Sequence, residues 1–163
     1  MTSFNENVLV KQLVKHEGVM LNIYQDSLGI DTIGIGRNVK DRGFSKFELR
    51  MIGKTVEEIY LAGITEEDAY FLLRADIDIV ARELLNVKPV TGDVDSIRQL
   101  VLMDMAFNMG VPRLCKFINM WAALEQHDYN KAADEMLDSK WAKQVKSRAT
   151  NLAHSMQYGT YVN

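Results

Sequence analysis

Two carboxylates near the start of the chain stand in unlike surroundings. Glu17 ends an expected helix in the sequence His-Glu-Gly, and Asp26 stands at the tip of an expected glycine-rich hairpin. Thr32 follows Asp26 by six residues, on the returning strand. Hydrolysis of a glycosidic bond requires one protonated acid and one ionised partner. The spacing alone is equally compatible with a helix, a turn and two surface acids, because acids are common beside turn glycines.

The two surroundings favour different protonation states. The end of a helix carries partial negative charge, which disfavours ionisation of Glu17, and apolar neighbours would add to this effect. A protonated Glu17 could donate its proton to the leaving glycosidic oxygen. In a polar turn, Asp26 would stay ionised and could activate a water molecule or attack the sugar directly. A hydroxyl at Thr32 could hold that water, although a strand threonine is usually only a good β-former.

Glycines and capping patterns predict the elements that carry these residues. Seven of the ten glycines lie between residues 18 and 63, which places the hairpins in the first third of the chain. Ser3 and Glu6 form the pattern of a capping box, and the helix that they open should end at Gly18. We expect strands at residues 20–24 and 30–36, joined by a turn at residues 27–29.

The rest of the chain has helical patterns. Capping patterns at Thr55 and Thr65 open a short helix and a long helix that runs to about residue 85. Residues 94–109 are apolar almost all round, as in a buried helix, and shorter helices should occupy residues 113–124, 128–138 and 143–156. We therefore expect one mostly helical α+β domain: a β-containing lobe at about residues 18–64, a linking helix at 65–85 and a helical lobe from 1–17 and 86–163.

Composition excludes several classes of protein. A net charge of −3 argues against a general nucleic-acid binder. No apolar run is long enough to cross a bilayer, and the polar, acidic start of the chain does not resemble a signal peptide. The lone Cys115 permits no intramolecular disulfide and is expected to be a small buried residue. The histidines are too widely spaced for a metal site, so we expect neither a metal nor another cofactor.

Several groups of residues, in order, resemble the phage-type lysozymes from about residue 10 to residue 160. These groups are His-Glu-Gly at 16–18, Ile-Tyr-Gln-Asp-Ser-Leu-Gly at 23–29, Thr-Ile-Gly-Ile-Gly at 32–36, Ile64-Thr65 with Asp76, Met-Ala-Phe-Asn-Met-Gly at 105–110, and Trp141 with Arg148. The resemblance implies a lysozyme-like fold with a cleft between two lobes. It also implies that Glu17, Asp26 and Thr32 are the catalytic residues.

The resemblance extends to supporting residues. It places Arg148 beside Glu17, and it places Phe107 and Asn108 on the cleft as substrate-binding residues. Asn38 is a weaker candidate for the lip of the cleft.

Two positions depart from the usual family pattern. Arg37 stands where the family usually has histidine, and it should pair with Asp76. That pairing would depress the pKa of Asp76, and it would not weaken as the pH rises past neutrality, because guanidinium stays protonated. Leu28 is apolar where a polar or acidic lip residue is common in the family.

The family's activity would make this chain an endolysin that hydrolyses the β-1,4 bond between N-acetylmuramic acid and N-acetylglucosamine in peptidoglycan. The resemblance implies a monomer that waits in the host cytoplasm until a separate, holin-like protein permits its release to the periplasm and cell wall. A hydroxyl at Thr32 could hold a water molecule in place for attack on the sugar, so we expect a reaction that inverts the anomeric configuration. Two alternatives remain: a lytic transglycosylase, which cleaves the same bond without water, and a catalytically silent wall-binding virion module.

Overall fold

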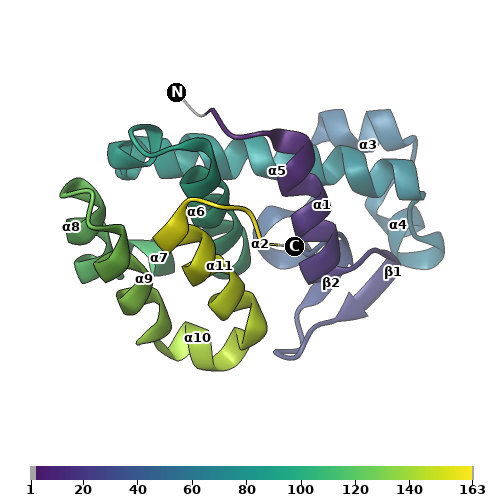
Figure 1. Ribbon diagram of the computed structural model, residues 1–163. Helices are drawn as coiled ribbons and strands as arrows, with labels where there is room; N and C mark the ends of the chain where they lie inside the picture. The colour runs from purple at the N-terminus through teal and green to yellow at the C-terminus, as the bar shows by residue number, and fades with distance from the viewer. Residues whose placement is uncertain (1–2, 163) are drawn as a thin grey trace. The chain divides into compact units, whose positions relative to one another are not determined.

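The computed structural model describes residues 3–162, and its elements are labelled in Figure 1. Its contacts divide the chain into two units, one formed by Met1–Gln12 with Ile79–Asn163 and the other by Leu13–Asp78. All strands of the described residues belong to the unit Leu13–Asp78, and helices predominate elsewhere. The fold is therefore α+β and mostly helical, as the sequence predicted. The role of residues 65–85 as a link between lobes stays a prediction.

The sheet consists of three antiparallel strands in the order β1-β2-β3: β1 (Met20–Gln25), β2 (Asp31–Gly34) and β3 (Arg37–Asn38). In its register, Tyr24 lies opposite Thr32, and Thr32 lies opposite Asn38. The predicted hairpin is confirmed, but the second strand is shorter than expected. It ends because Gly34 and Gly36 take positive φ values of 67° and 69°, which turn the chain into β3.

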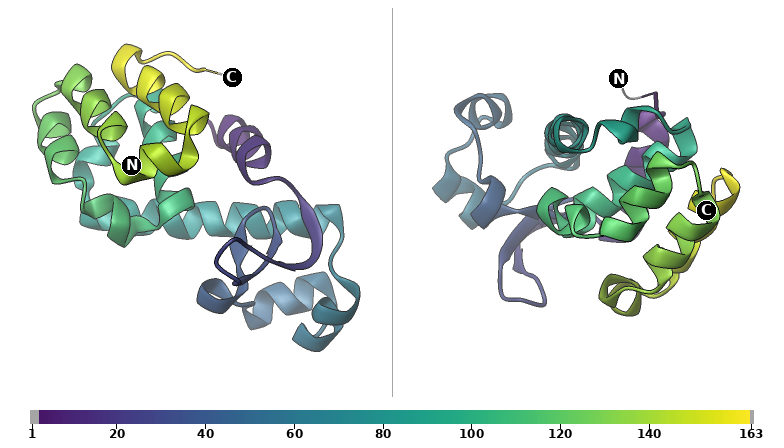
Figure 2. Two further views of the ribbon diagram at one scale, coloured as in Figure 1. Left: turned by 90° about the horizontal axis from the view of Figure 1, so that it is seen from below. Right: turned by 90° about the vertical axis from the view of Figure 1, so that its left-hand side faces the viewer.

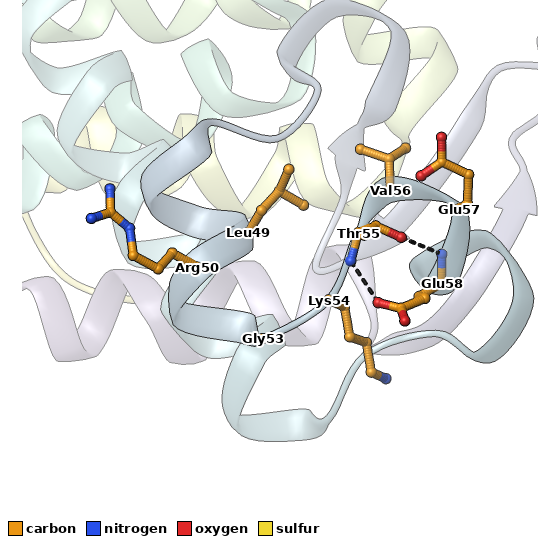
Figure 3. A pocket seen from close by; sticks show the side chains of 8 residues that line it. All are labelled: Leu49, Arg50, Gly53, Lys54, Thr55, Val56, Glu57 and Glu58. Atoms are coloured by element: carbon orange, nitrogen blue, oxygen red, sulfur yellow. Dashed lines mark hydrogen bonds between the residues drawn. The ribbon is translucent and has the colours of Figure 1, made fainter.

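Three short helices follow the sheet: α2 (Val39–Arg42), α3 (Lys46–Ile52) and α4 (Val56–Ala62). The capping box predicted at Thr55 is confirmed. The Thr55 side chain accepts a hydrogen bond from the Glu58 backbone, and the Glu58 carboxylate accepts one from the Thr55 backbone, as Figure 3 shows. Ser45 and Glu48 form the same box at the start of α3, a helix that the sequence analysis missed although its signal was equally clear.

Helix α1 (Glu6–Glu17) begins two residues later than the Ser3 box would place it. Asn5 acts as the cap, because its side-chain oxygen accepts hydrogen bonds from the backbone N–H groups of Asn7 and Val8. The backbone N–H of Ser3 instead donates to Gln99. The expected Ser3 cap was therefore wrong, whereas the end of the helix before Gly18 is confirmed.

The long helix and the buried helix are both confirmed. Helix α5 (Glu66–Val87) starts at the predicted Thr65 cap and extends two residues past its predicted end. Helix α6 (Ser96–Met109) is capped by Asp95, and its residues 99–106 are all buried.

The C-terminal region contains more, shorter helices than predicted. They are η1 (Pro89–Gly92), α7 (Val111–Cys115), α8 (Ile118–Glu125), α9 (Tyr129–Leu137), α10 (Lys140–Val145) and α11 (Ser147–Tyr158). The range 113–124, predicted as one helix, contains parts of two, α7 and α8. The range 143–156 was also predicted as one helix, but Lys146, with a φ of 53°, separates α10 from α11 there. Helix α9 packs against both α8 and α11 (Figure 1 and Figure 2). Cys115 is only half-buried, which corrects the expectation of a buried residue.

A buried charge cluster organises the unit Leu13–Asp78. Arg37 is 2% exposed, and its guanidinium makes paired hydrogen bonds with two carboxylates: 3.0 and 2.7 Å to Asp76, and 3.0 and 2.9 Å to Glu48. It also donates to the carbonyl groups of Gly43 and Leu72. The predicted pair of Arg37 with Asp76 is confirmed. Glu48 is a partner that the sequence did not reveal.

The two carboxylates respond differently to this environment. Burial raises the pKa of Asp76 by more than the neighbouring Arg37 and Arg42 lower it. The expected depression of the Asp76 pKa was therefore wrong, because desolvation outweighs the ion pair. Burial also acts to raise the pKa of Glu48, but hydrogen bonds from Arg37 and Ser45 outweigh it, and the pKa is lowered.

Glu48→Gln should destabilise the protein by about 2–3 kcal/mol at pH 7, because a buried guanidinium loses a charged partner. A lowered pKa means that Glu48 contributes this stability above its unfolded pKa of about 4.3. The contribution is lost as the pH falls through the lower, folded pKa. Urea unfolding at pH 7 and pH 3, with the exposed Glu57→Gln as control, should show a smaller gap from wild type at pH 3 than at pH 7. An equal gap at both pH values would contradict this account.

Candidate active site

Glu17 is the last residue of α1 and is half-buried. Its carboxyl group packs against the backbone of Gly36: a Cβ atom at Gly36 would lie 3.1 Å from both Cγ and Oε2 of Glu17. Residues 34 and 36 form the turn between β2 and β3, so the glycine that permits this turn also leaves room for the acid. The sequence alone did not reveal that Glu17 would use this space.

Asp26 is held by its own turn. Its Oδ1 atom accepts hydrogen bonds from the backbone N–H groups of Leu28 at 2.8 Å and Ile30 at 3.0 Å. These two bonds fix the direction of the carboxylate, as short acidic side chains often do in turns. No residue within 3–162 donates a hydrogen bond to Oδ2, so this oxygen can accept one from a substrate or water.

Thr32 lies on β2 and is 5% exposed. Its hydroxyl donates a hydrogen bond of 3.0 Å to the carbonyl oxygen of Ile30. Because that bond uses the only hydroxyl proton, Oγ1 can interact with a further group only as an acceptor. Asp26 is bound to the same residue, Ile30, through its backbone and its side chain. The hairpin turn therefore positions both predicted groups.

Asn38 has a local structural contact. Its side-chain oxygen accepts a hydrogen bond from the Asp41 backbone, and its amide group donates to the Asp41 carboxylate, so it caps α2. Both ends of the amide are used in this way. Its expected role at the lip of a cleft stays a prediction.

Phe107 and Asn108 lie in the last turn of α6 and are half-buried. The Asn108 side-chain oxygen accepts a hydrogen bond of 2.7 Å from the indole N–H of Trp141. Trp141 is 2% exposed and belongs to the core. This bond orients Asn108 so that its NH₂ group is the part that could donate to a sugar.

Arg148 is held by a buried acid that the sequence analysis missed. Its Nε donates to Oδ1 of Asp104 at 2.8 Å, while Oδ2 of Asp104 accepts from Gln12 at 2.6 Å. Asp104 is fully buried. One acid in an otherwise apolar stretch of helix was the available signal, because a buried charge requires partners. The pairing of Arg148 with Glu17 would join residues of the two units and stays a prediction.

Other features of the described residues add no chemistry to this site. Within 3–162, no group of three or more His, Cys, Asp or Glu side chains could hold a metal ion, and no helix is long and apolar enough to span a membrane. An open depression between α3 and α4 is drawn in Figure 3. Its lining residues, from Leu49 to Glu58, include none of the residues predicted for the site.

Comparison with known proteins identifies relatives over most of the chain. It is 32% identical over 161 residues to the pre-baseplate central spike protein Gp5 of Enterobacteria phage T4, an alignment that covers 93% of this chain and only 28% of the spike protein. Two probable T4-type lysozymes of Dictyostelium discoideum, 1 and 2, are each 27% identical, over 93% of this chain and 95% of theirs.

A family model described as phage lysozyme matches residues 14–154. The match includes Glu17, Asp26 and Thr32, together with the charge cluster around Arg37. It also includes the two buried tryptophans, Trp121 and Trp141. It spans most of the chain, from the last turns of α1 into α11. By this match, and by the mostly helical α+β fold with its small antiparallel sheet, the chain belongs to the phage lysozyme family and is a glycoside hydrolase.

Proposed function

We propose that this protein is an endolysin-type muramidase with Glu17 as general acid and Asp26 as general base. Its substrate would be the β-1,4 bond between N-acetylmuramic acid and N-acetylglucosamine in peptidoglycan. The observation that carries the proposal is the pair of open acceptors in the hairpin, Asp26 Oδ2 and Thr32 Oγ1. Family membership supports the same reaction class.

These two acceptors suit an attacking water. The water would donate one O–H to Asp26 and the other to Thr32, which leaves a lone pair for the anomeric carbon. As the new C–O bond forms, Asp26 takes a proton from the water, and Glu17 gives its proton to the departing glycosidic oxygen. The bond between the anomeric carbon and that oxygen breaks. Attack by a water held apart from the acid inverts the anomeric configuration.

Residues of the other unit would support this reaction. Asn108 would donate to the glycan through its NH₂ group, and Phe107 would offer an apolar face to a sugar ring. Arg148, held by Asp104, would stabilise the charge of Glu17 once the acid has given up its proton. Asn38 would contribute to the lip of the binding cleft. No metal or organic cofactor takes part in this mechanism.

The biological role that we propose is lysis of the host cell. A monomer would accumulate in the host cytoplasm and reach the periplasm and cell wall when a separate, holin-like protein permeabilises the membrane. The net charge of −3 implies that binding to the wall relies on the site itself rather than on general attraction to an anionic polymer.

A second candidate role is favoured by the similarity to a phage central spike protein. In that role the chain would act on, or only bind, the cell wall as part of a virion. A lytic transglycosylase is the other alternative, but the open acceptors at Asp26 and Thr32 favour a reaction that uses water. Detection of the protein in purified virions would support the virion role.

Glu17→Gln should reduce hydrolysis of purified peptidoglycan by at least about a hundredfold, because an amide cannot donate the required proton. The fold should persist, since the two side chains are nearly isosteric. Release of reducing ends measures the activity, and the exposed Glu57→Gln serves as a matched control. More than a few per cent of wild-type activity in Glu17→Gln would exclude Glu17 as the general acid.

Gly36→Ala should lose about tenfold to a hundredfold in activity, because the new Cβ would displace the Glu17 carboxyl group. Gly53→Ala is the control: Gly53 has a similar φ of +75°, yet a Cβ there meets nothing within 4 Å. Both variants should lose about 1–2 kcal/mol of stability from backbone strain, but only Gly36→Ala should lose activity in the same peptidoglycan assay. Equal activities would show that Gly36 does not position the acid.

The reducing sugar formed first should be the α-anomer. Proton NMR in the first moments of turnover distinguishes the mechanisms before mutarotation mixes the anomers. Initial β-anomer would indicate a retaining route and would remove the role given to Thr32. An anhydro-muramic end, detected by product mass, would instead establish a transglycosylase.

A further inference from the structure

One face of the β1–β2 hairpin carries a residue that the mechanism has not used. Tyr24 pairs directly with Thr32, so their side chains lie on the same face, with Cβ atoms about 4.5–5.5 Å apart. The next pair, Gln25 and Asp31, projects from the opposite face. On that opposite face, the hydroxyl of Tyr60 donates to Asp31 at 2.8 Å. Tyr24 therefore shares its face with the residue proposed to hold the water.

The phenol of Tyr24 lies near both proposed catalytic acids. Burial raises the pKa of Tyr24, and the charges of Glu17 and Asp26 raise it further. These carboxylates come from different elements, the end of α1 and the turn after β1. Glu57 and Glu58 of α4, which also packs against β1, are not among the charges that act on Tyr24. The phenol consequently keeps its proton and remains a hydrogen-bond donor.

This donor is not used within the protein. No residue within 3–162 accepts a hydrogen bond from the Tyr24 hydroxyl, although the side chain is half-buried. Tyr60, by contrast, has its hydroxyl bonded to Asp31. A half-buried donor without a partner is costly unless water or a ligand completes it.

We propose that Tyr24 is a further substrate-contacting residue, whose hydroxyl donates a hydrogen bond to an oxygen of the sugar bound between Glu17 and Asp26. This inference rests on the proposed function, because it names a contact of the same site. An N-acetylated sugar offers hydroxyl oxygens and an acetamido carbonyl oxygen as acceptors. A neutral donor suits this place, since a cation there would pair with the acids instead of with the sugar.

Removal of the hydroxyl alone tests this contact. Tyr24→Phe should lower kcat/KM on soluble, uncross-linked peptidoglycan strands by roughly three- to tenfold, as expected for one neutral hydrogen bond. Tyr60→Phe is the matched control, because it removes a phenol hydroxyl from a carboxylate on the other face. Its kcat/KM should stay within about twofold of wild type, since Asp31 has no proposed role in the reaction.

Binding without turnover separates a substrate contact from a structural effect. In a Glu17→Gln background, adding Tyr24→Phe should weaken binding of the same strands by a similar factor, while adding Tyr60→Phe should not. Equal kinetics and equal binding for the two tyrosine variants, with an active wild type, would overturn the Tyr24 proposal alone. An inactive wild type would instead overturn the proposed function.

Discussion

Arg37 is almost fully buried, and a buried guanidinium is tolerated only when its N–H groups have partners. Glu48 and Asp76 supply carboxylates from α3 and α5, and two backbone carbonyls complete the set. This one cation therefore ties the last strand of the sheet to two helices that are distant in sequence. Such a cluster gives directional constraints that apolar contacts alone would not provide, and it fixes the position of β3 within its unit.

The same cluster stands next to the proposed acid. Gly36 directly precedes Arg37, and the carboxyl group of Glu17 rests against Gly36. Anchoring of Arg37 consequently fixes the surface against which the acid packs. The positive φ values at Gly34 and Gly36 make the turn possible, and the missing side chain at Gly36 makes the contact possible. The stability of this unit and the position of Glu17 therefore depend on two adjacent residues, Arg37 and Gly36.

The acids of this protein are fixed in different ways. Asp26 is held by backbone N–H groups two and four residues away, so a local turn is enough to orient it. Asp104 is fully buried and depends on side chains distant in sequence, Gln12 and Arg148. Local fixation leaves one oxygen of Asp26 available for chemistry. The partners of Asp104 instead use both of its oxygens, which suits a structural anchor for Arg148.

The sequence by itself determined the local features. The Thr55 cap, the turn at Asp26 and the buried helix α6 depend on neighbouring residues, whose preferences act over a few positions. The order of the motifs was also enough to predict the family, because catalytic groups recur at fixed spacing.

Only the tertiary structure decided the long-range partners. Glu48 beside Arg37 and Asp104 beside Arg148 involve side chains 11 and 44 residues apart, and no local preference encodes such a meeting. The tertiary structure also decided the direction in which the pKa of Asp76 shifts, since the balance between desolvation and ion pairing depends on how deeply the fold buries the pair.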